Sequence, residues 1–276
     1  MDVALRLHTF ARRTCMDRYS RWATLYGELA RGGRNRIDGF GDYTDAAYAI
    51  FPRYNVLQAV LDRIETLDPA ALPDVDELRS LLFRAAMTAS SDFTQDIGNP
   101  IHDSTLADER ETLAQTFRSV SDAELAEVEH LFYRRVLSAD EEQSWRETIA
   151  RVWGAPDGYW YPLTSKTHPS LVALELIGVR DTLPDRLRRF FAENAIERLI
   201  ELRELDASSE IQADAATVAY FGSEGFWTSP ENQWIIYCSH EGTITFGGAI
   251  AAEIGPEYPA SHYDPSQPPH WSAVPN

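Results

Sequence analysis

Apolar side chains in the first half of the chain recur at the spacing of one helix face. Between residues 15 and 30 they return every three or four positions, and the same spacing follows Asn55 and Asp74. Ser121–Glu124 and Ser138–Glu141 match the capping box, in which a serine and a glutamate satisfy backbone donors at a helix start. The pattern therefore predicts a series of helices over residues 1–130.

Glycine, proline and polar residues mark the expected ends of these helices. The glycine-rich segment Arg31–Gly41 should end the first helix, and Thr44 should cap a short helix that ends near Pro52. Residues 92–103 read as a loop. They place His102 outside a helix, with Asp103 or Ser104 as the expected cap of the helix that follows.

The pattern changes near residue 131, where strands are expected among further helices. Strand signals fall at 132–137, 159–161, 171–176 and 198–204, with a helix as the alternative for 198–204, and helix signals fall at 139–153 and 184–194. From Pro256 the chain becomes proline-rich, which favours an irregular tail. We expect an α+β fold, with a helical region over 1–130 and a mixed, mainly antiparallel sheet with flanking helices over 131–276. One continuous domain is the alternative.

Residues 234–246 contain the clearest hairpin signal, with a turn at Glu241-Gly242. This turn would pair Cys238 with Thr245 and Tyr237 with Phe246. Strand alternation would then place one set of side chains on the core face: Ile235, Tyr237, Ser239, Ile244 and Phe246. The opposite face would carry Trp234, Ile236, Cys238, His240, Thr243 and Thr245, either as a recognition surface or packed under a helix.

Charge narrows the class of partner. The chain has 25 Lys+Arg against 43 Asp+Glu, a net charge of −18. Repulsion from phosphates argues against a nucleic-acid partner, whereas a basic protein would be attracted. Residues 1–36 are basic, unlike the chain as a whole, because they contain eight arginines and three acidic residues. That segment is expected to dock on the acidic remainder of the chain. Lys166 is the single lysine, as codon bias in a GC-rich bacterial genome would produce.

Location and cofactors follow from what the sequence lacks. No apolar run approaches the roughly 18 residues of a membrane span, and no apolar secretion segment is present. Two cysteines do not make a disulfide framework, so a reduced, cytoplasmic location without a membrane partner is expected. The usual hydrolase, nucleotide-binding and zinc signatures are also missing, so we expect no cofactor and no metal.

Several weaker signals leave a chemical alternative beside a plain structural one. The Arg31–Gly41 loop could cradle a phosphate or simply connect two helices. His102-Asp103 weakly resembles the metal-binding dyad of HD-type phosphohydrolases, and the alternative is a helix cap. Cys238 and His240 would lie within about 7 Å on one strand, as a nucleophile pair or as ordinary packing. The tail residues His262, Asp264 and His270 could join a metal site or lie at the surface.

The segment Phe226–Gly248 resembles the C-terminal hairpin of bacterial toxin-immunity proteins. The resemblance rests on Phe226-Trp-Thr-Ser, on Trp234-Ile-Ile-Tyr-Cys-Ser-His-Glu, and on the strand that ends in Thr-Phe-Gly-Gly. It implies a cytoplasmic, acidic, non-catalytic protein that covers the active site of a toxin. A basic nuclease would suit the negative charge of this chain.

Two functions are therefore expected. The first is a protein-binding module, an immunity or defence-associated protein, whose binding surface consists of Trp160, Tyr161, Trp227, Trp234 and His240. The second is a hydrolase-type enzyme with a cleft between the two halves. Its reactive group would be His240, acting with Glu241 or Cys238.

Overall fold

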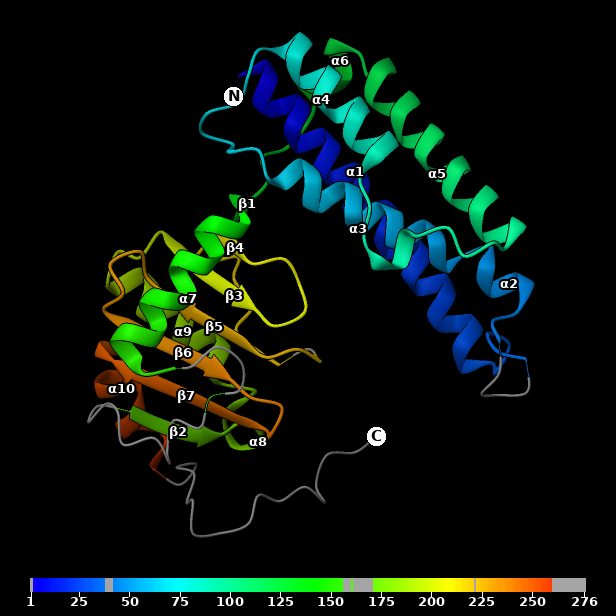
Figure 1. The fold of residues 1–276 in the computed structure, drawn as a ribbon. Coiled ribbons are helices and arrows are strands. Elements are labelled where there is room, and N and C mark those ends of the chain that lie inside the picture. Colours follow the sequence, from blue (N-terminus) through cyan, green and yellow to red (C-terminus); the bar gives the residue numbers. More distant parts are fainter. Residues whose placement is uncertain (1, 38–41, 156–159, 161–170, 221, 260–276) are drawn as a thin grey trace. The chain divides into compact units, whose positions relative to one another are not determined.

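The chain divides into two compact units in a computed structural model (Figure 1). One unit is Met1–Leu131 and the other is Phe132–Asn276. The structure describes residues 2–37, 42–155, 160, 171–220 and 222–259. The first unit is helical, and the second combines a sheet with helices. The fold class is α+β, as the sequence predicts.

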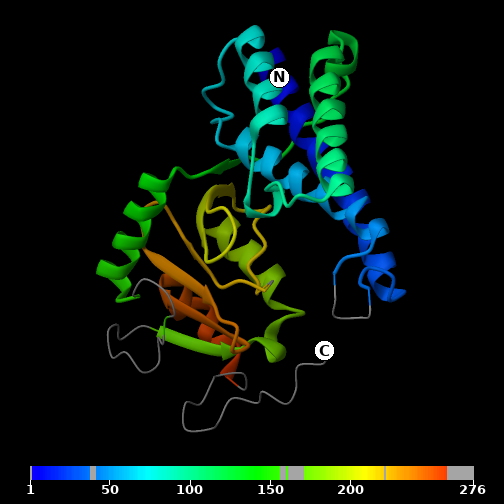
Figure 2. The same ribbon diagram turned by 45° about the vertical axis from the view of Figure 1, so that its right-hand side comes forward.

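Long helices packed side by side form the first unit (Figure 2). Their bounds are α1 Val3–Arg31, α2 Asp45–Tyr48, α3 Phe51–Glu65, α4 Val75–Thr88, the 3-10 turn η1 Asp92–Thr94, α5 Pro100–Ser119 and α6 Asp122–Ala126. Helix α1 packs along α3, and α4 packs along α5. The apolar stripes meet in one core, which includes Leu7, Cys15, Leu57, Leu82 and Phe117. Burying these stripes is what stabilises the helices.

The arginines of α1 are bonded within the helical unit. Arg12 forms a buried ion pair with Glu65 at 2.8 Å, and Arg18 lies 2.6 Å from the buried carboxylate of Glu109. Arg13 donates hydrogen bonds to the carbonyls of residues 129 and 130. Part of the basic charge at the start of the chain is thus neutralised by acids on α3 and α5, as expected.

Helix boundaries agree with the sequence where a local cap sets them. Thr44 accepts a hydrogen bond from the amide of Ala47 and caps α2, as predicted. Pro52, expected to end that helix, instead lies in the first turn of α3, where a proline loses no intrahelical hydrogen bond. The cap of α5 is Asn99, so the prediction of a loop at His102 is wrong. Asn99 precedes Pro100, and proline favours the first helical position.

The second unit contains a seven-stranded sheet in which all the pairs are antiparallel. The strands are β1 Arg134–Val136, β2 Leu171–Glu175, β3 Arg198–Arg203, β4 Ser209–Gln212, β5 Gly225–Thr228, β6 Trp234–Cys238 and β7 Thr243–Gly248. Their order is β1-β4-β3-β5-β6-β7-β2. The helices are α7 Ala139–Trp153, α8 Leu176–Val179, α9 Leu183–Glu193 and α10 Ala249–Ile254, with the 3-10 turn η2 Gly255–Glu257.

Helices cover both faces of this sheet (Figure 1). Helices α9 and α10 pack on the face that carries Trp234, Ile236 and Phe246. Helix α7 packs on the other face, against Ile235 and Tyr237. All five residues of β6 are buried as a result. A strand buried on both faces reads as continuously apolar, so its sequence does not distinguish core from surface.

The register of the β6–β7 hairpin differs by one residue from the prediction. Cys238 pairs with Ile244, and Tyr237 pairs with Thr245. The turn spans Ser239–Gly242, with Gly242 at a φ of 73°. A tight turn extended by one left-handed glycine shifts the pairing by one position. Ile244 and Phe246 therefore share a face with Trp234 and Cys238, and not with Tyr237 as expected.

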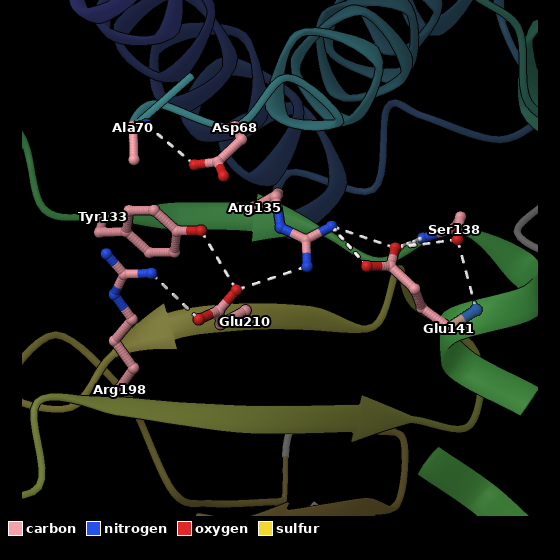
Figure 3. A network of polar contacts seen from close by, with 8 residues as sticks. All are labelled: Asp68, Ala70, Tyr133, Arg135, Ser138, Glu141, Arg198 and Glu210. Atoms are coloured by element: carbon pink, nitrogen blue, oxygen red, sulfur yellow. Dashed lines mark hydrogen bonds and ion pairs between the residues drawn. The ribbon is translucent and has the colours of Figure 1, made fainter. Parts of the chain in front are cut away.

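Edge strand β1 is held by a charged network (Figure 3). Glu210 on β4 accepts a hydrogen bond from the Tyr133 hydroxyl at 3.1 Å and from Arg198 at 3.2 Å. Arg135 lies 3.4 Å from the same carboxylate and 2.9 Å from Glu141, the capping-box glutamate of α7. The network joins β1, β3, β4 and α7, so it ties this edge of the sheet to the helix that packs on one of its faces.

Candidate functional site

A buried carboxylate lies beneath the turn of the β6–β7 hairpin. Glu224, which precedes β5, has a side chain that is 9% exposed. It accepts hydrogen bonds from the Tyr237 hydroxyl, from the backbone amide of His240 at 3.2 Å and from the hydroxyl of Ser239 at 3.5 Å. The Nδ1 atom of His240 lies 2.5 Å from Oε1 of Glu224. Four polar groups from the hairpin thus converge on one carboxylate.

This arrangement orients the imidazole of His240. A carboxylate at Nδ1 favours the tautomer that carries its proton there, which leaves Nε2 as the ring atom that faces away from Glu224. The side chain of His240 is 47% exposed, so the ring is both oriented and accessible to solvent. The sequence analysis found His240 and missed Glu224. The two meet because β5 pairs with β6, a pairing that no local motif encodes.

The partners predicted for a catalytic His240 need correction. The carboxylate bonded to His240 is that of Glu224, and not Glu241. Cys238 is fully buried on the face that packs against α9 and α10, and burial raises the pKa of its thiol. A thiol held neutral within a core is a poor nucleophile. A cleft between the two halves stays a prediction.

The predicted aromatic binding surface on the sheet is not exposed. Trp160, Trp227 and Trp234 are 1%, 0% and 2% exposed, respectively, so the expectation that they anchor a partner at the surface is wrong. They are covered because helices pack on both faces of the sheet. Tyr161 lies outside the described residues. His240 is thus the accessible member of that set within the described part of the chain.

The weaker chemical signals have structural explanations where they are described. His102 lies in the first turn of α5, 2.8 Å from Asp103 and in contact with the rings of Tyr48 and Phe51. Arg36 of the glycine-rich loop stacks on Tyr43 at 3.6 Å, and residues 38–41 of that loop lie outside the described residues. So do His262, Asp264 and His270. Across the described residues, no cluster of three or more His, Cys, Asp or Glu could hold a metal ion.

Half-buried aromatic side chains gather at one end of the helical unit, where the C-terminal part of α1 meets α2 and the start of α3. We call this the aromatic surface; its members are Tyr19, Trp22, Tyr26, Tyr43, Tyr48, Phe51 and Tyr54. Tyr26 has its ring centroid 5.7 Å from that of Tyr54, and Tyr43 lies 4.7 Å from Phe51. No member belongs to the fully buried core. The rings support one another and still present part of their area to solvent.

Arginines fix the edges of the aromatic surface. The guanidinium of Arg53 lies 4.9 Å from the ring of Trp22 and bonds Glu109 at 3.0 Å. Arg18 binds the other oxygen of the same carboxylate. Burial, reinforced by neighbouring tyrosines, raises the pKa of Tyr54 to about 12, so its hydroxyl stays neutral. Aromatic side chains and arginines are enriched at protein-binding surfaces.

Comparison with known proteins found no family model, curated protein or solved structure that matches this chain. Among the described residues, no helix has the length and apolar character needed to cross a membrane.

Proposed function

We propose that the chain is a non-catalytic protein-binding module, and that its partner docks on the aromatic surface of the helical unit. The observation that carries this proposal is the gathering of seven half-buried Tyr, Trp and Phe side chains in one cluster outside the core. Aromatic side chains lose little conformational freedom on binding and bury a large area, which makes them effective anchors. Arg53 and Arg36 stack on these rings and limit their motion further.

We propose further that the partner is a basic protein. The net charge of −18 would attract a positively charged partner to the chain as a whole. The aromatic surface itself lies partly in the Arg-rich residues 1–36, where Arg18, like Arg53 of α3, is paired with the buried carboxylate of Glu109. The resemblance of Phe226–Gly248 to immunity proteins suits a toxin as the partner, and the negative charge of the chain suits a basic nuclease. Neutralisation of such a toxin in the cytoplasm is the specific form of the proposal.

The test uses an exposed position on α1 next to members of the aromatic surface in the sequence. Leu25 is 36% exposed and follows Trp22 by one helical turn on α1, so Leu25→Arg adds bulk and positive charge without entering the core. Phe93→Arg is the matched control, because Phe93 is 72% exposed on η1 of the same unit. Tagged wild type and both variants are used to capture proteins from the native cells, with elution by a salt gradient.

The expected result is a single stoichiometric basic protein that wild type and Phe93→Arg retain and Leu25→Arg loses. Its affinity for purified wild type should fall at least tenfold with Leu25→Arg, which corresponds to about 1.4 kcal/mol. Equal retention by all three proteins would exclude the aromatic surface. Capture of no stoichiometric protein by wild type would exclude the binding function.

Catalysis at His240 is the second candidate, because Glu224 holds Nδ1 of an accessible imidazole. Phosphoester, ester and amide substrates can be screened with wild type and His240→Ala. Turnover that His240→Ala loses, with the fold retained, would favour an enzyme over the binding module.

A further inference from the structure

The α+β unit contains a pocket of about 450 Å³ that neither the aromatic surface nor the His240 site includes. It lies where the C-terminal end of α9 meets the start of β3, the 229–233 loop and Ala249. Its lining includes the apolar residues Ile196, Pro230 and Ala249 and the exposed acidic residues Glu197 and Glu231. The pocket belongs to one unit, so its form depends on contacts within that unit alone.

Two features make this pocket attractive to a cation. The carboxylates of Glu197 and Glu231 supply negative charge from two different segments of its lining. The C-terminal end of α9, an 11-residue helix capped by Asn194, carries the negative end of the helix dipole.

The positive charge in the lining is already engaged. Arg198 lines the pocket, but its guanidinium bonds Glu210 at 3.2 Å and stacks on the ring of Tyr133 at 3.8 Å. This pairing directs it toward β4 and β1, and not toward an anion in the pocket (Figure 3). A ligand therefore meets Glu197 and Glu231 as the charges available for recognition.

The walls are held by the fold itself. Asn232, in the 229–233 loop, accepts a hydrogen bond from the Trp153 indole at 2.9 Å and from the Thr228 hydroxyl at 3.1 Å. Asn232 and Ala195 are the residues other than glycine with positive φ in the described part of the chain, at 55° and 51°. Each lies in a segment that lines the pocket, and the packing on α7 and β5 keeps the loop in this conformation. A pocket that is formed before binding costs less to fill.

We propose that this pocket binds a guanidinium or alkylammonium group. The shared chemistry is a positively charged group on an aliphatic stem, which is found at the end of an arginine or lysine side chain and in small free amines. The positively charged head would lie between the carboxylates of Glu197 and Glu231 and donate charge-assisted hydrogen bonds to them, with the aliphatic stem against Ile196, Pro230 and Ala249. This site lies in a different unit from the aromatic surface, so it stands independently of the proposed function.

The test is a titration of the full ¹⁵N-labelled chain, followed by two-dimensional NMR. The probes are Gly-Arg-Gly with blocked ends, the neutral isostere Gly-citrulline-Gly with blocked ends, and free agmatine. We expect Gly-Arg-Gly to shift the amides of Ala195, Glu197 and Gln233 saturably, with citrulline inactive. Equal shifts with citrulline, or none at concentrations on the order of 10 mM, would overturn the proposal. If agmatine also binds, the site accepts any cation of this kind. If only the peptide binds, the site is specific for a side chain carried by a protein.

A second experiment repeats the titration with variants that remove the negative charges of the pocket. Glu197→Gln and Glu231→Gln should each weaken binding of Gly-Arg-Gly about fivefold, since each removes one charged acceptor. Glu175→Gln is the matched control. Glu175 is exposed on β2 and pairs with Thr243, at the end of the sheet opposite Gly248. Unchanged binding in the double variant Glu197→Gln/Glu231→Gln, with the rest of the spectrum retained, would overturn the assignment.

Discussion

The imidazole Nδ1 of His240 lies 2.5 Å from Oε1 of Glu224, a residue 16 positions earlier in the chain. This contact joins the turn of the β6–β7 hairpin to the start of β5. The same carboxylate also accepts hydrogen bonds from the Tyr237 hydroxyl and the His240 amide. Glu224 is therefore the polar centre of this end of the sheet, whatever chemistry His240 performs.

Replacing Glu224 with alanine should destabilise the α+β unit by about 3 kcal/mol. The substitution leaves several donors without their acceptor, and each buried donor that loses its partner costs roughly 1–3 kcal/mol. Urea unfolding followed by tryptophan fluorescence would measure the change. Glu241→Ala is the control, because Glu241 is next to His240 in the sequence but its carboxylate does not bond the imidazole. This variant should change the free energy of unfolding by less than about 0.5 kcal/mol. Similar losses in both variants would contradict the role assigned to Glu224.

Both cysteines should be unreactive in the folded protein. Cys15 and Cys238 are each 0% exposed, and burial raises the pKa of both thiols. Because the thiolate is the reactive form, labelling by a disulfide reagent should be slower than for a free thiol by about three orders of magnitude, and limited by unfolding. Labelling of native protein and of protein in urea, located by mass spectrometry, measures this. Rapid labelling of Cys238 in the native protein would contradict this prediction and would restore Cys238 as a candidate nucleophile.

The stability of the helical unit should fall in mild acid because of His8. Burial and the neighbouring charge of Arg12 lower the pKa of His8 from 6.5 to about 4. The unfolded chain takes up a proton below about pH 6.5, and the folded chain does so only near pH 4. The stabilising contribution is thus complete above pH 6.5 and is lost as the pH falls toward 4. Between pH 7 and pH 5 the loss should reach about 2 kcal/mol.

The variant His8→Gln isolates this contribution. Glutamine can still donate to the carbonyl of Ile64, which lies 3.3 Å from Nε2 of His8, but it does not titrate. The difference in unfolding free energy between wild type and variant should shrink from pH 7 to pH 5. A difference that stays constant would show that His8 is protonated equally in both states.

Replacing Glu201 with glutamine should stabilise the α+β unit at neutral pH. Burial raises the pKa of Glu201, and the nearby charge of Arg203 only partly opposes this effect. The folded state therefore disfavours the ionised carboxylate, and this cost grows as the pH rises above the ordinary value of 4.5. Glutamine retains an acceptor for the Trp227 indole, which lies 3.2 Å from Oε1. Thermal unfolding at pH 7 and pH 4 should show a gain for Glu201→Gln that is larger at pH 7, and a loss at pH 7 would contradict it.

The sequence by itself determined what depends on neighbouring residues. The capping boxes at Ser121 and Ser138 begin α6 and α7 as predicted, because each satisfies donors within three positions. Gly154 ends α7 in the left-handed conformation that glycine adopts readily. The fold class followed from the same local signals, since helical and strand periodicities occupy different parts of the chain.

Tertiary structure alone decided what depends on distant residues. Burial of all five residues of β6, Trp234 among them, required both faces of the sheet to be covered, and a run of apolar residues reads the same whether one face or two are buried. The partner of His240 was set by the pairing of β5 with β6, which brings Glu224 across 16 positions. The aromatic surface likewise arises where α1, α2 and α3 meet. Periodicity assigns a side chain to one face of its own element, and only the packing of the elements determines what that face meets.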